Sequence, residues 1–208
     1  EAMTINLKLY GKENVGYINA LNSLALTHEE LGMYREAEVE FTEAANLRRK
    51  TLGANHPDYA VALHNMYNVK QILGKTDEAE SLLMACLAVC EKSGGKTTSA
   101  YVNALISLAG FYSSKGNYAL AEKTYTECLK LSKEVNGVLH PEYATLLNNV
   151  GMYYIETGDY IKAEKYLLQA LQIKKDAIGA NHPEMAYIYT NLSNINLQGG
   201  EYAKAEEY

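Results

Sequence analysis

The 208-residue sequence lacks tryptophan and holds only two phenylalanines, three prolines and three cysteines. It also lacks a run of about 18 apolar residues and a charged-then-apolar leader, which argues against a membrane span and a signal peptide. No stripe of lysine and arginine is visible, and the formal net charge of −6 argues against a nucleic-acid partner. The charged fraction of 21% is that of an ordinary soluble chain. We therefore expect a cytoplasmic protein that binds neither membranes nor nucleic acids.

Glycine, in contrast, is regularly spaced along the whole chain. Two sets of five glycines each recur every 42 residues. An Ala-Glu pair follows each member of the second set at a fixed distance. The first set is Gly11, Gly53, Gly95, Gly137 and Gly179, and the second is Gly32, Gly74, Gly116, Gly158 and Gly200. Such a period indicates a stacked-repeat solenoid. A solenoid offers an extended concave surface, so its default function is to bind another protein.

Two amphipathic helices are expected in each repeat, as the fourth copy illustrates. Pro141 suits the first position of a helix, where its missing N–H would be unpaired anyway. Apolar residues then recur at three- and four-residue steps, at Tyr143, Leu147, Val150 and Tyr154. Gly158 predicts the end of this helix, and a second helix is expected from about residue 160 to just before Gly179. Gly151 and Ala163 are small enough to let the two helices approach closely.

The second and third repeats depart from this pattern. Thr98-Ser99 stands where other repeats have His-Pro, which predicts a less rigid helix start. Tyr67 and Lys70 stand where the fourth repeat has Gly151 and Tyr154. We expect local irregularity around residues 64–100.

The motif Gly-x-Tyr-x-x-Ala-Glu, found at residues 32–38 and 158–164, resembles the tetratricopeptide repeat. The 42-residue spacing and the segments Gly-Ala-Asn-His-Pro (53–57) and Leu-Asn-Asn-Val-Gly (147–151) are similar to the kinesin-light-chain subclass. The resemblance covers nearly the whole chain. It implies an all-α fold, a right-handed superhelical α-solenoid of antiparallel helix pairs. The approximate units are 1–10, 11–52, 53–94, 95–136, 137–178 and 179–208, where the first is the end of a second helix and the last is truncated.

The resemblance also implies that the first helix of each pair lines a concave groove. The groove residues that we predict as peptide-binding are Asn19, Asn22, His64, Asn65, Asn68, Asn103, Asn148, Asn149, Met152, Tyr187, Asn191 and Asn194. This surface is rich in asparagine and contains no lysine or arginine. An asparagine side chain can pair with a peptide backbone whatever the peptide's side chains, so we expect an extended ligand. The missing cations argue against a clamp for a C-terminal carboxylate, and Glu29, Glu30 and Glu156 favour a neutral or basic partner.

A structural role for some of these asparagines remains open. Asparagine is a poor residue for the middle of a helix, so its recurrence needs a reason. Asn65, Asn149 and Asn191 could bond to the adjacent repeat or to a ligand, whereas ligand contact is favoured for Asn68 and Asn194.

Other residues that suggest chemistry have simpler interpretations. The recurring tyrosines fall on the buried stripe and are expected to pack there: Tyr17, Tyr59, Tyr101 and Tyr143. The recurring histidines precede helices and are expected to cap them: His56, His140 and His182. The cysteines are expected to be small packing residues, because two of them replace alanines of other repeats and no further ligand has metal-site spacing: Cys86, Cys90 and Cys128.

The predicted function is non-catalytic binding of an extended peptide or protein segment, with no metal or other cofactor. The alternative is a structural or regulatory role, in which the array spaces or inhibits an attached effector domain such as a protease or signalling ATPase. A third hypothesis places an enzyme domain outside this sequence. We expect a piece of a longer array, whose apolar end faces would also allow self-association.

Overall fold

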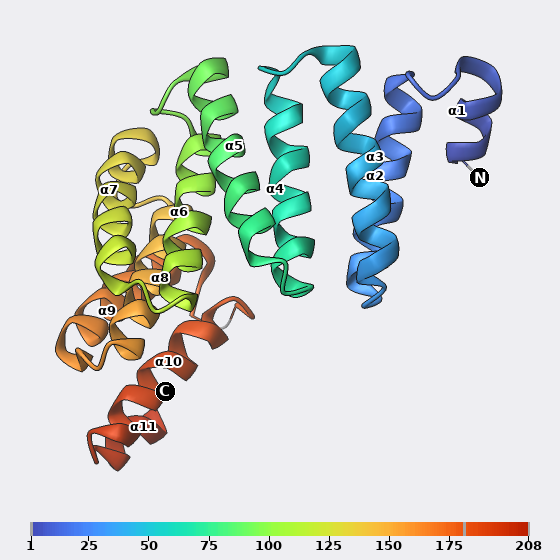
Figure 1. Ribbon diagram of the computed structural model, residues 1–208. Helices are drawn as coiled ribbons and strands as arrows, with labels where there is room; N and C mark the ends of the chain where they lie inside the picture. The colour runs from blue at the N-terminus through green and yellow to red at the C-terminus, as the bar shows by residue number, and fades with distance from the viewer. Residues whose placement is uncertain (1, 181, 208) are drawn as a thin grey trace. The chain divides into compact units, whose positions relative to one another are not determined.

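The computed structural model describes residues 2–180 and 182–207, and within these ranges it contains eleven helices and no strand (Figure 1). The helices are α1 (Ala2–Tyr10), α2 (Val15–Glu30), α3 (Tyr34–Leu52), α4 (Pro57–Ile72), α5 (Thr76–Gly94), α6 (Ser99–Ser114), α7 (Tyr118–Asn136), α8 (Pro141–Glu156), α9 (Tyr160–Ile178), α10 (Met185–Gln198) and α11 (Tyr202–Glu207). By their contacts, residues 1–104 and 105–208 form two compact units, each described by itself below.

The predicted histidine caps are present at α4 and α8. His56 Nδ1 accepts a hydrogen bond from the backbone N–H of Asp58 at 3.1 Å, and His140 does the same for Glu142 at 3.2 Å. Each bond satisfies one of the N–H groups that a helix start leaves unpaired. His182 accepts from the N–H of Glu184 at 3.3 Å, but α10 begins only at Met185. The third repeat keeps the register without His-Pro, because Thr98 Oγ1 accepts from the N–H of Tyr101 at 3.3 Å.

Glycines separate the helices as predicted. Gly158 follows α8 with φ +79°, and Gly179 follows α9 with φ +84°. This left-handed conformation is unfavourable for residues that carry a Cβ. The other eight glycines of the two periodic sets also have positive φ, between 70° and 96°.

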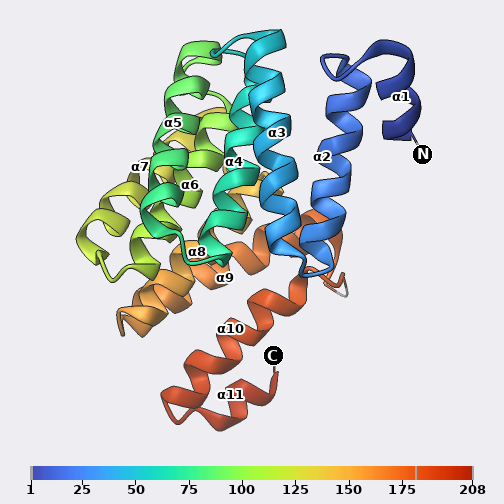
Figure 2. The same cartoon turned by 45° about the vertical axis from the view of Figure 1, so that its right-hand side comes forward.

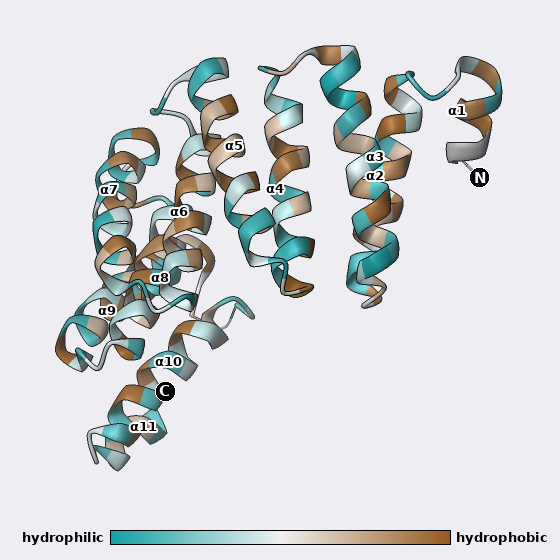
Figure 3. Ribbon diagram, viewed as in Figure 1, coloured by the Kyte–Doolittle hydropathy of each residue, from teal (hydrophilic) through white to brown (hydrophobic). Residues whose placement is uncertain are grey.

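In residues 1–104, α2 packs on α3 and α4 packs on α5, while α3 also packs on α4. Figures 1 and 2 both show α4 and α5 lying side by side. Phe41 of α3 is fully buried with Ala25 and Val69, so it joins helices of two adjacent pairs. Both α4 and α5 run without a break through most of residues 64–100, so the irregularity expected there is not seen in the helix bounds. Figure 3 shows that these helices carry hydrophobic and hydrophilic residues on the same turn.

In residues 105–208, α8 packs on α9, α9 packs on α10, and α10 packs on α11. The fully buried core includes Leu147, Leu167 and Leu192, one from each of α8, α9 and α10. Gly151 and Ala163 are buried at the predicted close approach. A Cβ atom built on Gly151 would lie 2.7 Å from Leu167 Cγ, so only glycine fits there without a shift of Leu167.

Most of the predicted packing residues are buried. Tyr17 and Tyr101 are buried, and Tyr59 and Tyr143 are half-buried. All three cysteines are buried, as expected of packing residues: Cys86, Cys90 and Cys128. Among the described helices, none is both long and apolar enough to cross a membrane.

Candidate functional site

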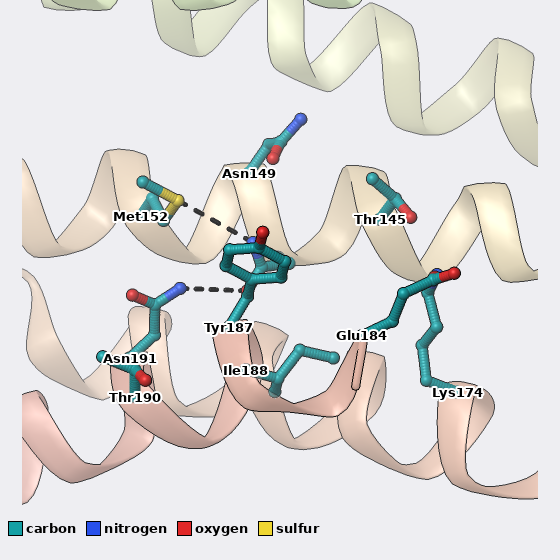
Figure 4. A pocket seen from close by; sticks show the side chains of 10 residues that line it. Thr145, Asn149, Met152, Lys174, Glu184, Tyr187, Ile188, Thr190 and Asn191 are labelled. Carbon is teal, nitrogen blue, oxygen red and sulfur yellow. Dashed lines mark hydrogen bonds and ion pairs between the residues drawn. The ribbon is translucent and has the colours of Figure 1, made fainter. Parts of the chain in front are cut away.

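A cleft of about 660 Å³ lies between α8 and α10, with α9 beneath it. We call it the α8–α10 cleft, and Figure 4 shows it from close by. Its lining contains five of the predicted groove residues, namely Asn148, Asn149, Met152, Tyr187 and Asn191. The rest of the lining is Thr145, Lys174, Glu184, Ile188 and Thr190. Side chains from two successive first helices of the repeat therefore meet in one hollow.

Asparagine side chains form the polar end of this cleft. Asn191 Nδ2 donates to Asn148 Oδ1 at 3.0 Å, and Asn148 Nδ2 approaches Met152 Sδ at 3.7 Å (Figure 4). The first bond joins α8 to α10, so Asn191 connects adjacent repeats. Asn149 is half-buried, and its side chain makes no hydrogen bond to any residue that the structure describes. Its amide is therefore the better placed of the three to meet a ligand.

Exposed apolar side chains accompany these amides. Tyr187 is 73% exposed and Met152 is 43% exposed, while Ile188 beside them is buried. In Figure 4, Tyr187 lies between Met152 and Asn191 at one end and Lys174 and Glu184 at the other. The cleft thus offers apolar contact area next to amide donors and acceptors.

An ion pair closes the other end of the cleft. Lys174 Nζ lies 2.6 Å from Glu184 Oε2, and Lys174 is only 8% exposed. The hydrogen bond from Lys174 lowers the pKa of the Glu184 carboxyl below its ordinary value. The prediction that the groove contains no lysine or arginine is therefore wrong. It counted side chains of the first helices only, whereas Lys174 reaches the cleft from α9, the second helix of its pair.

A second cleft, of about 430 Å³, lies between α4 and the start of α6, with α5 beneath it. We call it the α4–α6 cleft. It is lined by Pro57, Ala60, Val61, His64, Cys86, Cys90, Ala100, Asn103 and Ala104. Two predicted groove residues, His64 and Asn103, meet here. Burial lowers the pKa of His64, which favours the neutral imidazole.

Three further predicted residues, Asn19, Asn22 and Asn65, belong to a hydrogen-bond network with the buried Arg48. Asn65 Nδ2 donates to Asn22 Oδ1 at 3.2 Å, the same bond between first helices that Asn191 makes. Arg48 of α3 donates to Asn22 Oδ1 at 3.4 Å and to Asn19 Oδ1 at 3.5 Å. These bonds support the structural interpretation of Asn65 and Asn191. Arg48 is a second cation that the sequence prediction missed.

Comparison with known proteins identifies the family of this chain. The tetratricopeptide repeat family model matches residues 17–92, 66–134, 100–176 and 142–208, which together span most of the chain. The chain belongs to the tetratricopeptide repeat family. No curated protein matches it significantly.

Several solved structures are similar. BtubC (BKLC) from P. vanneervenii superposes with a TM-score of 0.81 at 21% identity, over 99% of this chain and 83% of that one. A putative kinesin light chain with nearly identical TPR-like repeats, from Podosopora anserina, gives 0.73 at 20% identity, over 91% and 90%. A Rap protein in complex with Competence and Sporulation Factor gives 0.77 at 16% identity, over 99% of this chain and 59% of that one. The all-α solenoid class and the kinesin-light-chain likeness are confirmed.

The repeat register relates the missed cations to one position of the second helix. This position holds Arg48, Cys90, Ser132 and Lys174 in the four complete repeats. The position ten residues later, at the start of the next first helix, holds Asp58, Ala100, Glu142 and Glu184. Asn68 lines neither cleft, and Asn194 lies in a shallow depression along α10.

Proposed function

We propose that this tetratricopeptide repeat chain is a non-catalytic interaction module that binds an extended peptide or protein segment across its first helices. The α8–α10 cleft carries the proposal. It combines Asn149, whose amide has no hydrogen-bond partner among the described residues, with the exposed Tyr187 and Met152. The half-buried Asn149 amide has donors and an acceptor to offer a ligand, and exposed apolar surface beside polar groups marks binding sites.

Two further observations support a protein ligand. The Rap protein of similar fold was solved in complex with Competence and Sporulation Factor, so a protein of this fold can form such a complex. The net charge of −6 favours a neutral or basic segment over nucleic acid.

A display library of random linear peptides, selected on the native chain, provides the test. Enriched peptides are then measured by fluorescence polarisation against Met152→Glu and Leu168→Glu. These two residues are a matched pair, because Met152 is 43% exposed in the cleft and Leu168 is 41% exposed on α9. We expect Met152→Glu to weaken binding at least about tenfold, roughly the effect of 1.4 kcal/mol, and Leu168→Glu to leave it unchanged. Equal affinity of all three proteins would refute the groove site.

One observation favours the alternative, a scaffold that contacts an attached domain through its second helices. Met84 of α5 and Leu168 of α9 occupy the same repeat position and are both exposed, Met84 to 52%. A full-length protein in which Leu168→Glu releases an attached domain, while Met152→Glu does not, would establish this role instead.

A further inference from the structure

The two clefts lie at the same position of the repeat, one in the second repeat (53–94) and one in the fourth (137–178). Thr145, Asn148 and Ile188 of the α8–α10 cleft correspond to Val61, His64 and Ala104 of the α4–α6 cleft. The decisive difference is the ion pair. Lys174 corresponds to Cys90 and Glu184 corresponds to Ala100, so the α4–α6 cleft has no ion pair at this place.

The α4–α6 cleft is apolar at its base. The base is formed by buried residues, namely Ala60, Ala104, Cys86 and Cys90. The Cys86 thiol donates a hydrogen bond to the backbone oxygen of Ala60 at 3.3 Å. None of the nine residues that line the cleft carries a carboxylate, an ammonium or a guanidinium group. The polar side chains of its lining are His64 and Asn103, which come from the first helices on either side.

This lining discriminates between side chains by charge. A carboxylate or ammonium group that entered would lose its water and find no opposite charge. An aliphatic or aromatic side chain would instead replace water against Val61, Ala60 and Ala104. The volume of about 430 Å³ lies near the lower end of the range for ligand pockets, which suits one large side chain with part of its backbone.

We propose that the α4–α6 cleft is a specificity pocket that takes one uncharged apolar side chain, of the leucine, methionine or phenylalanine class, from the bound segment. His64 and Asn103 border this pocket from the two first helices. This proposal rests on the proposed function and adds the chemistry of the partner: a segment with an apolar anchor at this repeat. The equivalent place between α8 and α10 holds the Lys174–Glu184 ion pair instead.

Single blocked amino acids serve as probes of the pocket. N-acetyl amides of leucine, phenylalanine, lysine and aspartate are titrated into the native chain, and methyl NMR signals of Val61, Ala100 and Ala104 report on the pocket. The signal of Ile188 reports on the other cleft in the same sample. We expect leucine and phenylalanine amides to shift the first group, and lysine and aspartate amides to bind at least about tenfold more weakly. Equal shifts with all four amides would overturn the proposal.

Transplanting the ion pair tests the cause. Cys90→Lys/Ala100→Glu copies the charged pair of the other cleft and should abolish the shifts from the leucine amide. Because this variant buries a new charge, Ala100→Phe provides a second obstruction at an exposed position. A native melting temperature with unchanged leucine binding in Ala100→Phe would also overturn the proposal.

The outcomes separate this inference from the proposed function. In one outcome the selected peptides lose affinity for Met152→Glu, but the amides show no preference for apolar side chains. This result would refute the specificity pocket and support the interaction module. Amides that bind as expected, without any peptide being selected, would refute the proposed function and show that the occupant of the pocket is not a peptide segment.

Discussion

The α8–α10 cleft and the α4–α6 cleft show how one repeat can present two different surfaces. Both have a proline-started first helix on one side, the next first helix on the other and a second helix beneath. The lysine and glutamate that meet in one cleft are replaced together in the other, by Cys90 and Ala100. The third repeat has Ser132 and Glu142 at these two positions, so the pair does not change as a unit. The repeat therefore keeps its backbone and presents different side chains at the same two positions.

A deeper difference lies beneath the clefts, where the two helices of each pair meet. Tyr67 of α4 and Gly151 of α8 occupy the same repeat position. Tyr67 is buried, and burial raises its pKa to about 12, whereas Gly151 lets α8 approach Leu167 directly. This position thus carries a buried ring in α4, whereas in α8 it carries no side chain and faces the side chain of Leu167.

Tyr67→Ala should have the largest effect, because it leaves a cavity where a buried ring was. We expect a loss of about 3–5 kcal/mol in the free energy of unfolding. Tyr187→Ala removes an exposed ring and should stay within about 0.5 kcal/mol. Urea denaturation followed by circular dichroism measures both. A loss below about 1 kcal/mol for Tyr67→Ala would mean that α4 and α5 close over the gap and that the two pairs are alike.

Gly151→Ala should lower the free energy of unfolding by about 1–3 kcal/mol, because the new Cβ would lie 2.7 Å from Leu167 Cγ in a full core. Gly110→Ala is the control in the same unit. There the nearest atom would be the Tyr125 hydroxyl oxygen at 3.6 Å, an ordinary contact. Alanine is the better helix former, so this change should stabilise by up to about 1 kcal/mol. Equal effects at the two glycines would contradict a close approach specific to α8.

Periodic features were predictable from the sequence, and features that depend on a facing helix were not. The positive φ of Gly158, the cap at His140 and the burial of Leu167 follow from one repeat read alone. Lys174 was missed because it lies on a second helix, α9. Its side chain reaches the cleft through the gap between the first helices α8 and α10, and one repeat taken alone does not show that gap. The roles of Asn65 and Asn191 could not be decided beforehand, since each depends on an acceptor in the preceding repeat, at Asn22 and Asn148.

The asparagine bonds give a smaller effect that compares the two units. A double-mutant cycle of Asn148→Ala and Asn191→Ala should show a coupling of about 0.5–1.5 kcal/mol in the free energy of unfolding. The cycle of Asn22→Ala and Asn65→Ala should give a similar value, complicated by the contact of Arg48 with Asn22. Asn149→Ala, which breaks no hydrogen bond within the described chain, should change stability little. Zero coupling in both cycles would return Asn65 and Asn191 to the ligand-binding interpretation.

The smallest expected effect on stability concerns the Lys174–Glu184 ion pair. The α8–α10 cleft has this pair, and the α4–α6 cleft does not. Lys174 holds the pKa of Glu184 below its ordinary value of 4.5, so the pair stabilises the fold fully above that pH. This contribution is lost as the pH falls through the lowered pKa, where Glu184 takes up a proton. The difference in melting temperature between the native chain and Glu184→Gln should therefore shrink on acidification below pH 4.5. In a Lys174→Met background the same substitution should show no such pH dependence. A difference that persists at low pH in both backgrounds would mean that Glu184 acts through packing, and the charge contrast between the two clefts would then contribute nothing to stability.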